Sequence, residues 1–285
     1  MKCYLCESKS FSIRTGQVRD KPELKILECK NCGLVTLDSQ EHIGNGFYEE
    51  SGMHIGDQKS IDSWLNETYS DDKRRLEMVR AEIVNKKILD FGCGAAGFLK
   101  LAKELTLDAV GIEIENRVIK HWGENIKIFP AIKDAGTDFD LVTAFHVLEH
   151  LHDPRATLKK LSKTLRVSGR IIIEVPSSDD ALITLYNCLP FQRFTYWSQH
   201  LYLFNAQTIK MLATQAGLHV VAVKHHQRYP ISNHLYWQSQ GKPGGHKKWG
   251  FLDTPELNAA YQNSLAAIGK TDTIIAYLEA ENVNV

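Results

Sequence analysis

The chain carries no excess charge of either sign, because its 285 residues include 34 basic and 34 acidic side chains. A chain with zero formal net charge has no global attraction to nucleic acid or to an anionic membrane. It also contains no apolar run near the ~20 residues that a membrane-spanning helix needs. Its first ten residues, MKCYLCESKS, lack the apolar core of a signal peptide. These absences predict a cytoplasmic protein without a membrane partner, and they argue against nucleic acid as a ligand.

Cysteine is scarce, and most of it lies near the start of the chain. Four of the six cysteines form two CxxC pairs, whereas Cys93 and Cys188 are isolated. This usage favours metal binding in a reducing compartment over a disulfide framework.

The paired cysteines have the spacing of a zinc ribbon. They are Cys3, Cys6, Cys29 and Cys32, with 22 residues between the two pairs. Two thiolates three residues apart fit a tight knuckle, and two knuckles joined by a hairpin complete a tetrahedral four-cysteine zinc site. We therefore expect residues 1–40 to form a ribbon around a closed, structural Zn²⁺ site. A redox pair or free thiols are the alternatives.

The segment 87–113 has the order strand, glycine turn, helix, strand and acid. An apolar run ends at Asp90, and the turn 92–97 reads GCGAAG. A helical pattern then leads to a second apolar run, which ends at Glu113. This order predicts a βαβ unit with a nucleotide-type pocket at the strand ends.

The glycines and the acid of this unit each have a physical role. Gly92 and Gly94 let the backbone turn sharply and let a ligand lie against it, and Gly97 lets the helix approach the strand. Glu113 stands where a carboxylate can accept hydrogen bonds from both hydroxyls of a ribose.

The position of Asp90 distinguishes between candidate cofactors. A carboxylate two residues before the first glycine would repel the pyrophosphate of NAD, but it suits the cationic methionine end of S-adenosylmethionine (SAM). NAD, another nucleotide, or a glycine turn without a ligand are the alternatives. The strings LDFGCG (89–94) and VGIE (110–113) resemble the first two motifs of class I SAM-dependent methyltransferases. That resemblance implies a SAM site formed by Asp90, Gly92, Cys93, Gly94, Gly97 and Glu113.

Strand and helix patterns alternate through the rest of the chain, which argues for a doubly wound, mostly parallel sheet. The resemblance covers about residues 72–277 and implies the Rossmann-like, seven-stranded methyltransferase fold, closed by an antiparallel hairpin. We expect a connector or lid over 41–71 and the methyltransferase domain over 72–285. A helix should begin near Asp72. In the connector, Phe47 and Tyr48 are either lid residues or packing residues.

The stretch DLVTAFHVLEHLHDP (140–154) also matches HxxEH, an inverted metalloprotease motif. We reject that interpretation, because its ligands need a continuous helix, whereas here a strand runs directly into the motif. By resemblance to the methyltransferases, Phe145 and His146 line the SAM pocket near the sulfonium. Glu149 and His150 then hold the loop and the following helix together.

Residues 176–208 form an aromatic-rich insertion, which we expect to be a wall or lid of the substrate pocket. His200 in this segment is the first candidate for a general base, because imidazole titrates near neutral pH, and His146 is the second. A buried histidine that orders the loop is the alternative for His200. Residues 227–253, rich in glycine and lysine, predict an exposed loop that either holds a phosphate-bearing or sugar substrate or is simply solvated.

Taken together, the ribbon, the SAM motifs and the His200 segment resemble the zinc-ribbon methyltransferases that act on nucleotide-linked deoxysugars. This resemblance implies C- or O-methylation of a nucleotide-linked sugar or surface-polysaccharide precursor by direct displacement. A zinc-ribbon RNA methyltransferase is the alternative, and the zero net charge and lack of a basic stripe argue against it. A non-enzymatic scaffold is disfavoured by the intact glycine turn and Glu113.

Overall fold

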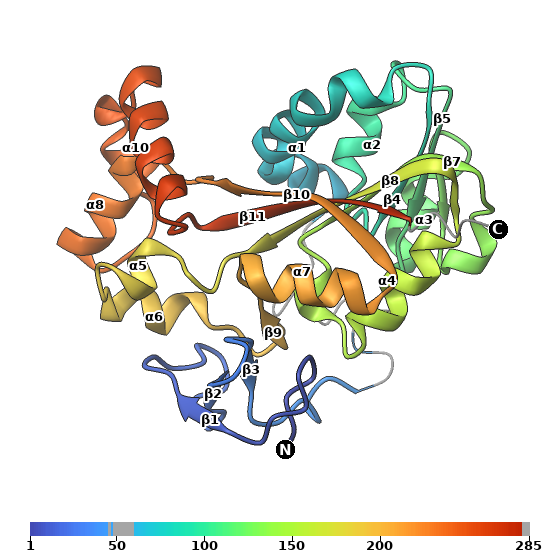
Figure 1. Ribbon diagram of the computed structural model, residues 1–285. Helices are drawn as coiled ribbons and strands as arrows, with labels where there is room; N and C mark the ends of the chain where they lie inside the picture. Colours follow the sequence, from blue (N-terminus) through green and yellow to red (C-terminus); the bar gives the residue numbers. More distant parts are fainter. Residues whose placement is uncertain (45–46, 48–59, 281–285) are drawn as a thin grey trace.

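The computed structural model describes residues 1–44, 47 and 60–280, and its centre is a twisted sheet (Figure 1). Within these residues, the sheet has seven strands in the order β10-β11-β8-β7-β4-β5-β6. The strands are β4 (Lys87–Phe91), β5 (Asp108–Ile112), β6 (Lys127–Phe129), β7 (Phe139–Phe145), β8 (Leu165–Pro176), β10 (Leu218–His226) and β11 (Thr273–Ala280). β11 is antiparallel to both of its neighbours, and the pairings among β8, β7, β4, β5 and β6 are parallel. The predicted doubly wound, mostly parallel sheet is therefore confirmed.

Parallel pairing brings the carboxyl ends of the central strands to one edge of the sheet. Asp90 of β4 lies in register with Gly111 of β5 and with Thr143 of β7. β4, β7 and residues 171–175 of β8 are buried, which explains why these stretches are mostly apolar. The glycine turn after β4, the acid after β5 and the loop after β7 therefore meet at this edge.

Helices cover both faces of the sheet (Figure 1). One face is covered by α1 (Ile61–Ile83), α2 (Gly97–Ala102) and α3 (Asn116–Trp122), and the other by α4 (Pro154–Ser162) and α7 (Ala206–Gln215). Each face has its own apolar core: Leu76 and Phe98 belong to the first, and Leu158 and Ile209 belong to the second. None of the helices in the described ranges is long and apolar enough to cross a membrane.

The cysteine-rich segment forms a small antiparallel sheet beneath the main one (Figure 1). It comprises β1 (Phe11–Ile13), β2 (Ile26–Cys29) and β3 (Val35–Leu37), and β3 also pairs with β9 (Tyr202–Leu203) from the insertion. The insertion further contains α5 (Ala181–Thr184) and α6 (Leu189–Thr195). The ribbon is thus joined to the insertion by strand pairing.

Helix α1 begins earlier than the sequence predicted. Its first residue is Ile61, not a residue near Asp72, and the side chain of Ser60 caps it by accepting from the Ser63 N–H at 3.1 Å. The connector expected over 41–71 therefore overlaps this helix. Phe47 packs against an apolar core, as the packing alternative predicts, and Tyr48 lies outside the described residues.

The expectation of an exposed loop over 227–253 was wrong. This stretch contains α8 (Ile231–Gln240), α9 (Gly245–Lys248) and the 3-10 turn η3 (Gly250–Leu252). α8 is held by Trp237, which is buried and lies with its ring centre 5.2 Å from that of Phe191. Gly241, at φ +62°, ends the helix in the left-handed conformation that glycine favours. The burial of Trp237 therefore stabilises a helix in a stretch whose glycine and lysine content predicted a loop.

The elements after α8 follow the expected order. α10 (Pro255–Ala267) leads into β11, which forms the antiparallel hairpin with β10. Two further 3-10 turns are η1 (Ile132–Asp134) and η2 (Leu148–His150). β8 starts at Leu165, and its pairing with β7 contains a shift in register. Ser168, at φ +66°, marks this irregularity.

Candidate active site

A cavity of about 470 Å³ opens at the carboxyl edge of the sheet. Of the residues expected to bind cofactor or act as a base, its wall includes Gly92, Cys93, Gly94, Gly97, Glu113, Phe145, His146 and His200. Asp90 lies behind this wall, buried near the end of β4. The structure therefore brings together residues that are up to 110 positions apart, from Asp90 to His200.

The glycine turn has the shape needed to hold a ligand against its backbone. Gly92 and Gly94 have φ of +70° and +53°, which glycine adopts without strain. A Cβ on Gly92 would also collide with the side chain of Val147. The turn is fixed by the Gly92 N–H, which donates to the Ile112 carbonyl at 2.8 Å.

Glu113 is fastened to this turn by backbone hydrogen bonds. Its carboxylate accepts from the N–H groups of Gly94, Ile114 and Glu115 at 2.9, 2.8 and 3.0 Å. Burial raises the pKa of Glu113, although these three bonds partly offset the shift. Oε1 accepts two of these bonds and Oε2 accepts one, so Oε2 keeps a lone pair that could accept a bond from a ribose hydroxyl.

Asp90 has a buried carboxyl group, and burial disfavours its ionised form. It is 3% exposed, and the Thr143 hydroxyl donates to it at 2.7 Å. Burial raises the pKa of Asp90 to about 7. A bound cation would stabilise its ionised form, and the methionine end of SAM is cationic. The neighbouring Cys93 thiol is kept neutral, because burial and the charges of Asp90 and Glu113 raise its pKa.

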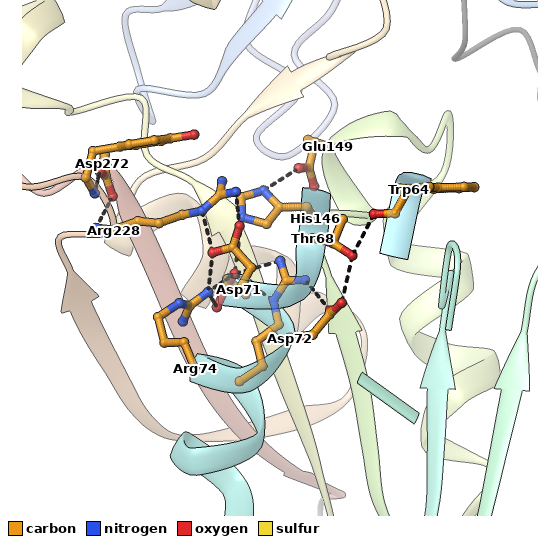
Figure 2. Close-up of polar contacts among 12 residues, drawn as sticks. Trp64, Thr68, Asp71, Asp72, Arg74, His146, Glu149, Arg228 and Asp272 are labelled. Carbon is orange, nitrogen blue, oxygen red and sulfur yellow. Dashed lines mark hydrogen bonds and ion pairs between the residues drawn. The ribbon is translucent and has the colours of Figure 1, made fainter. Parts of the chain in front are cut away.

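Gly97 was expected to let a helix approach a strand. In the structure it lets one helix approach another. It is the first residue of α2, and a Cβ there would collide with the carboxylate of Asp72 on α1. Asp72 in turn accepts from the Thr68 hydroxyl at 2.7 Å (Figure 2). This contact sets α1 directly over the glycine turn.

His146 lies between two buried carboxylates. Its Nδ1 is 3.2 Å from Glu149, and its Nε2 is 3.2 Å from Glu174 (Figure 2 shows the first contact). Burial disfavours the imidazolium, but the two carboxylates outweigh this effect and raise the pKa of His146. The backbone supports the placement, since His146 has φ +56° and its N–H donates to the Glu174 carbonyl at 2.8 Å.

Glu174 also contacts two arginines. It accepts hydrogen bonds from Arg74 at 2.8 Å and from Arg75 at 3.0 Å. The Arg75 guanidinium also lies 4.9 Å from the ring centre of Phe145. Burial would raise the pKa of Glu174, but His146 and the arginines lower it well below its usual range.

His200 and Trp197 line the cavity from the insertion, and the other aromatic residues of that segment pack elsewhere. The rings of His200 and His150 are 4.9 Å apart, and those of His200 and Trp197 are 5.5 Å apart. Nδ1 of His200 is buried without a hydrogen-bond partner. Burial, helped by the nearby His150, lowers the pKa of His200 to about 3, so the ring is neutral at physiological pH.

Glu149 and His150 line the cavity as well, which goes beyond the loop-holding role expected for them. His150 donates from Nδ1 to the Gln199 carbonyl at 2.9 Å, which turns its other nitrogen toward Glu149. Ligand atoms of Glu149, His150 and His200 lie within 4.8 Å of one another, so this trio could also hold a divalent cation.

The four paired cysteines converge as their spacing predicted. Sulfur atoms of Cys3 and Cys32, and those of Cys6 and Cys29, are 3.5 Å apart, and all four lie within 4.8 Å of one another. Such a cluster fits a tetrahedral ion with Zn–S bonds of ~2.3 Å. Hydrogen bonds from Asn31 and the Ser8 backbone outweigh burial and lower the pKa of Cys6 to about 6, whereas burial raises the pKa of Cys3 and of Cys32.

One wall of the cavity was missed by sequence reasoning. It is the face of α1 formed by Trp64, Thr68, Asp71, Asp72 and Arg75. Their spacing of four, three, one and three residues is the helical period, which could have identified them as one face. Arg228, after β10, was also missed as a wall residue, and it forms a bidentate ion pair with Asp71 (Figure 2).

Comparison with known proteins agrees with this architecture. A family model described as "Methyltransferase domain" matches residues 61–223. The ubiquinone biosynthesis O-methyltransferase of Idiomarina loihiensis is 29% identical over 101 residues, which are 31% of this chain and 42% of that protein. The mitochondrial ubiquinone biosynthesis O-methyltransferase of Schizosaccharomyces pombe is 25% identical over 126 residues, 40% of this chain and 46% of that protein. The match thus spans less than half the length of either curated relative.

Solved structures share the fold at low identity. A chain in the complex of the Haloferax volcanii Trm112 methyltransferase activator with a methyltransferase has a TM-score of 0.51 at 12% identity, over 79% of this chain and 97% of that chain. A SAM-dependent methyltransferase from Archaeoglobus fulgidus has a TM-score of 0.49 at 17% identity, over 74% and 93%. The fold, the cavity at the strand ends and the family match define a class I SAM-dependent methyltransferase, and the chain belongs to the methyltransferase-domain family.

Proposed function

We propose that this methyltransferase transfers the methyl group of SAM to a small-molecule acceptor, namely a nucleotide-linked sugar or surface-polysaccharide precursor. The observation that carries the proposal is the position of the neutral His200 ring beside Trp197, on the wall of the same cavity as the glycine turn. One cavity then accommodates both the cofactor and the acceptor, which suits direct displacement.

In this proposal, the strand-end residues hold the cofactor. Asp90, behind the glycine turn, attracts the cationic methionine end, and Glu113 accepts from the ribose, while Gly92, Gly94 and Gly97 leave room for the cofactor along the backbone. SAM supplies an electrophilic methyl group when bound. The protein's contribution is to align that group with an acceptor atom, because correct alignment alone removes much of the activation barrier.

His200 acts as the base that accepts the proton of the acceptor. Its ring is neutral, but a pKa of about 3 makes it a weak base at neutral pH, so the bound acceptor would have to raise that pKa before the ring takes up the proton. Glu149 lies within reach of it and stays ionised, because the bond to His146 outweighs burial and lowers the pKa of Glu149. That negative charge would stabilise the imidazolium of His200 after the transfer.

His146 is better suited to holding charge than to accepting a proton. Both of its ring nitrogens face carboxylates, and its raised pKa favours the imidazolium. It keeps Glu149 and Glu174 fixed at the edge of the cavity. We therefore propose His200 ahead of His146 as the base.

Two lines of support bear on the acceptor. The ribbon and the His200 segment resemble sugar-modifying methyltransferases, which favours a nucleotide-linked sugar. The curated relatives are named O-methyltransferases, which favours oxygen over carbon as the methylated atom. Bound Zn²⁺ would serve structure in the ribbon, because its four cysteines lie apart from the residues that line the cavity.

The test is methyl transfer from labelled SAM to a panel of nucleotide sugars, glycan precursors, acceptors of ubiquinone biosynthesis and total RNA. We expect label in a sugar acceptor. Label only in the ubiquinone-type acceptors would keep the small-molecule class and overturn the sugar assignment. Label only in RNA would replace the proposal by the RNA methyltransferase alternative.

A further inference from the structure

The ribbon binds the segment of the insertion that carries Trp197 and His200. Beyond the β3–β9 pairing, the Arg19 N–H donates to the Tyr196 carbonyl at 2.9 Å. The Thr36 hydroxyl donates to the Leu201 carbonyl at 3.0 Å. Residues 196–203 are thus bonded to the ribbon along their length.

The tightest of these contacts centres on Ser198, which is buried between the two cavity residues. Asp20 of the ribbon accepts from the Ser198 N–H at 3.0 Å and from its hydroxyl at 2.6 Å. His42 donates from Nε2 to the Ser198 carbonyl at 2.7 Å. Asp20 of the ribbon and His42, just after the ribbon, therefore satisfy both backbone polar groups of a buried residue, which is an obligatory pairing.

Ribbon residues also lie next to Trp197 and His200. The Arg19 guanidinium lies 4.6 Å from the ring centre of Trp197, a cation–π distance. A small void of about 10 Å³ is lined by Thr36 and Leu37 of the ribbon together with Trp197 and His200. Trp197 and His200 thus line the cavity and also border ribbon residues.

We propose that the ribbon positions the residues of the acceptor site, and that Asp20 is the principal positioning residue. Asp20 holds Ser198, and through it the neighbouring Trp197 and His200, in the orientation that faces the acceptor. The inference rests on the proposed function insofar as it assigns the acceptor to this end of the cavity. It predicts that ribbon residues far from the cofactor control turnover while leaving SAM binding unchanged.

The test compares Asp20→Ala with Asp38→Ala in the full chain. Asp38 is a matched control, because it is an exposed ribbon aspartate that accepts a backbone N–H, that of Lys25 at 2.9 Å, within the ribbon. Hydrogen–deuterium exchange of residues 196–203, the SAM dissociation constant, and kcat and KM with the acceptor labelled in the panel assay are measured for each protein. Asp20→Asn, which keeps an acceptor for the Ser198 N–H, is the conservative variant.

In Asp20→Ala we expect faster exchange over 196–203, an unchanged SAM dissociation constant and a loss of kcat of ~10–100-fold, as for a catalytic group displaced by about 1 Å. Asp38→Ala should match the wild type, and Asp20→Asn should recover part of the loss. Ser198→Ala removes the same 2.6 Å bond from the other side and should reproduce the direction of change if Asp20→Ala folds poorly.

Unchanged exchange in Asp20→Ala, or an equal effect of Asp38→Ala, would overturn the positioning role. Faster exchange with unaltered kcat and KM would do the same. The exchange measurement needs no acceptor, so it tests this inference separately from the proposed function. The proposed function fails if the panel yields no labelled small molecule.

Discussion

Asp90 shows how one buried carboxyl group can link cofactor binding to pH. Without a ligand, it is protonated below its pKa of about 7 and ionised above it. A cationic cofactor binds the ionised form, so binding below pH 7 must release a proton. The SAM dissociation constant should therefore rise by up to about tenfold per pH unit below about 7 and level off above it.

Calorimetric titration with SAM between pH 5.5 and 8.5 checks this prediction, and Asp90→Asn should flatten the slope while weakening binding at pH 8. Asp108→Asn is the control, because that exposed pair with Lys127 lies away from the cavity. If Asp90→Asn retained the full slope, the proton would belong to another group, and Glu113, whose pKa burial also raises, would be the first to examine.

His200 gives a prediction about turnover. His200→Ala should lower kcat by roughly 10²–10⁴-fold, the usual contribution of a general base, and leave SAM affinity as it is in the wild type. Steady-state kinetics and equilibrium binding measured on the same preparation separate the two effects. Full turnover in His200→Ala would remove this residue from the mechanism, and a parallel loss of SAM binding would indicate a collapsed cavity.

At the scale of elements, the ribbon should depend on its metal. Cys32→Ser removes one of four ligands, and we expect loss of bound zinc, a lower Tm and faster hydrogen exchange over β1 to β3 and 196–203. The reason is that so small a segment cannot build a sufficient core of its own. Cys188→Ser is the control, because Cys188 is buried outside the four-cysteine cluster.

Metal analysis and thermal unfolding of the two cysteine variants are the measurements. Zinc retained at one ion per chain in Cys32→Ser would contradict a four-cysteine site. A lower Tm with unchanged exchange over 196–203 would mean that the ribbon folds independently of the insertion.

Elements whose signals are local in sequence could be predicted, and those set by distant contacts could not. The turn 92–97 and the acid Glu113 occupy one short stretch, so spacing alone identified them. α1 was predicted too short because its polar face at Thr68 and Asp71 lines a cavity instead of facing solvent, which weakens its amphipathic pattern. α8 was missed because its stability comes from Trp237 packing against Phe191, a residue of the insertion.

At the scale of the whole molecule, the two ends of the methyltransferase domain meet at the cavity. Asp71 of α1 and Arg228 after β10 are 157 residues apart, which is why no sequence pattern could join them. Asp272, at the start of the last strand, accepts from the Arg228 N–H at 2.9 Å and fixes its backbone (Figure 2). The shape of the cavity therefore depends on the packing of α1 against the β10–β11 hairpin.

This arrangement predicts strong coupling between Asp71 and Arg228. Both side chains are largely buried, at 18% and 27% exposure, so either single change, Asp71→Asn or Arg228→Gln, removes the bidentate partner of a partly buried charge. Asp71 keeps a longer ion pair with Arg74, at 3.6 Å. We expect each single change to lower the free energy of unfolding by ~2–4 kcal/mol, and the double variant to lose less than the sum. The pair Glu77–Arg80 on the same helix is exposed at 54% and 46% and should show a much smaller coupling energy, because water screens it.

Urea unfolding of the two double-mutant cycles measures both coupling energies. A coupling for Asp71 and Arg228 no larger than that of the exposed pair would mean that water screens the contact and that the hairpin does not brace α1. A large coupling together with a raised acceptor KM and an unchanged SAM dissociation constant would show that long-range packing, and not the local cofactor motif, sets the acceptor end of the cavity. The cofactor end would then be local in sequence, while the acceptor end would depend on the ribbon, the insertion and the C-terminal hairpin together.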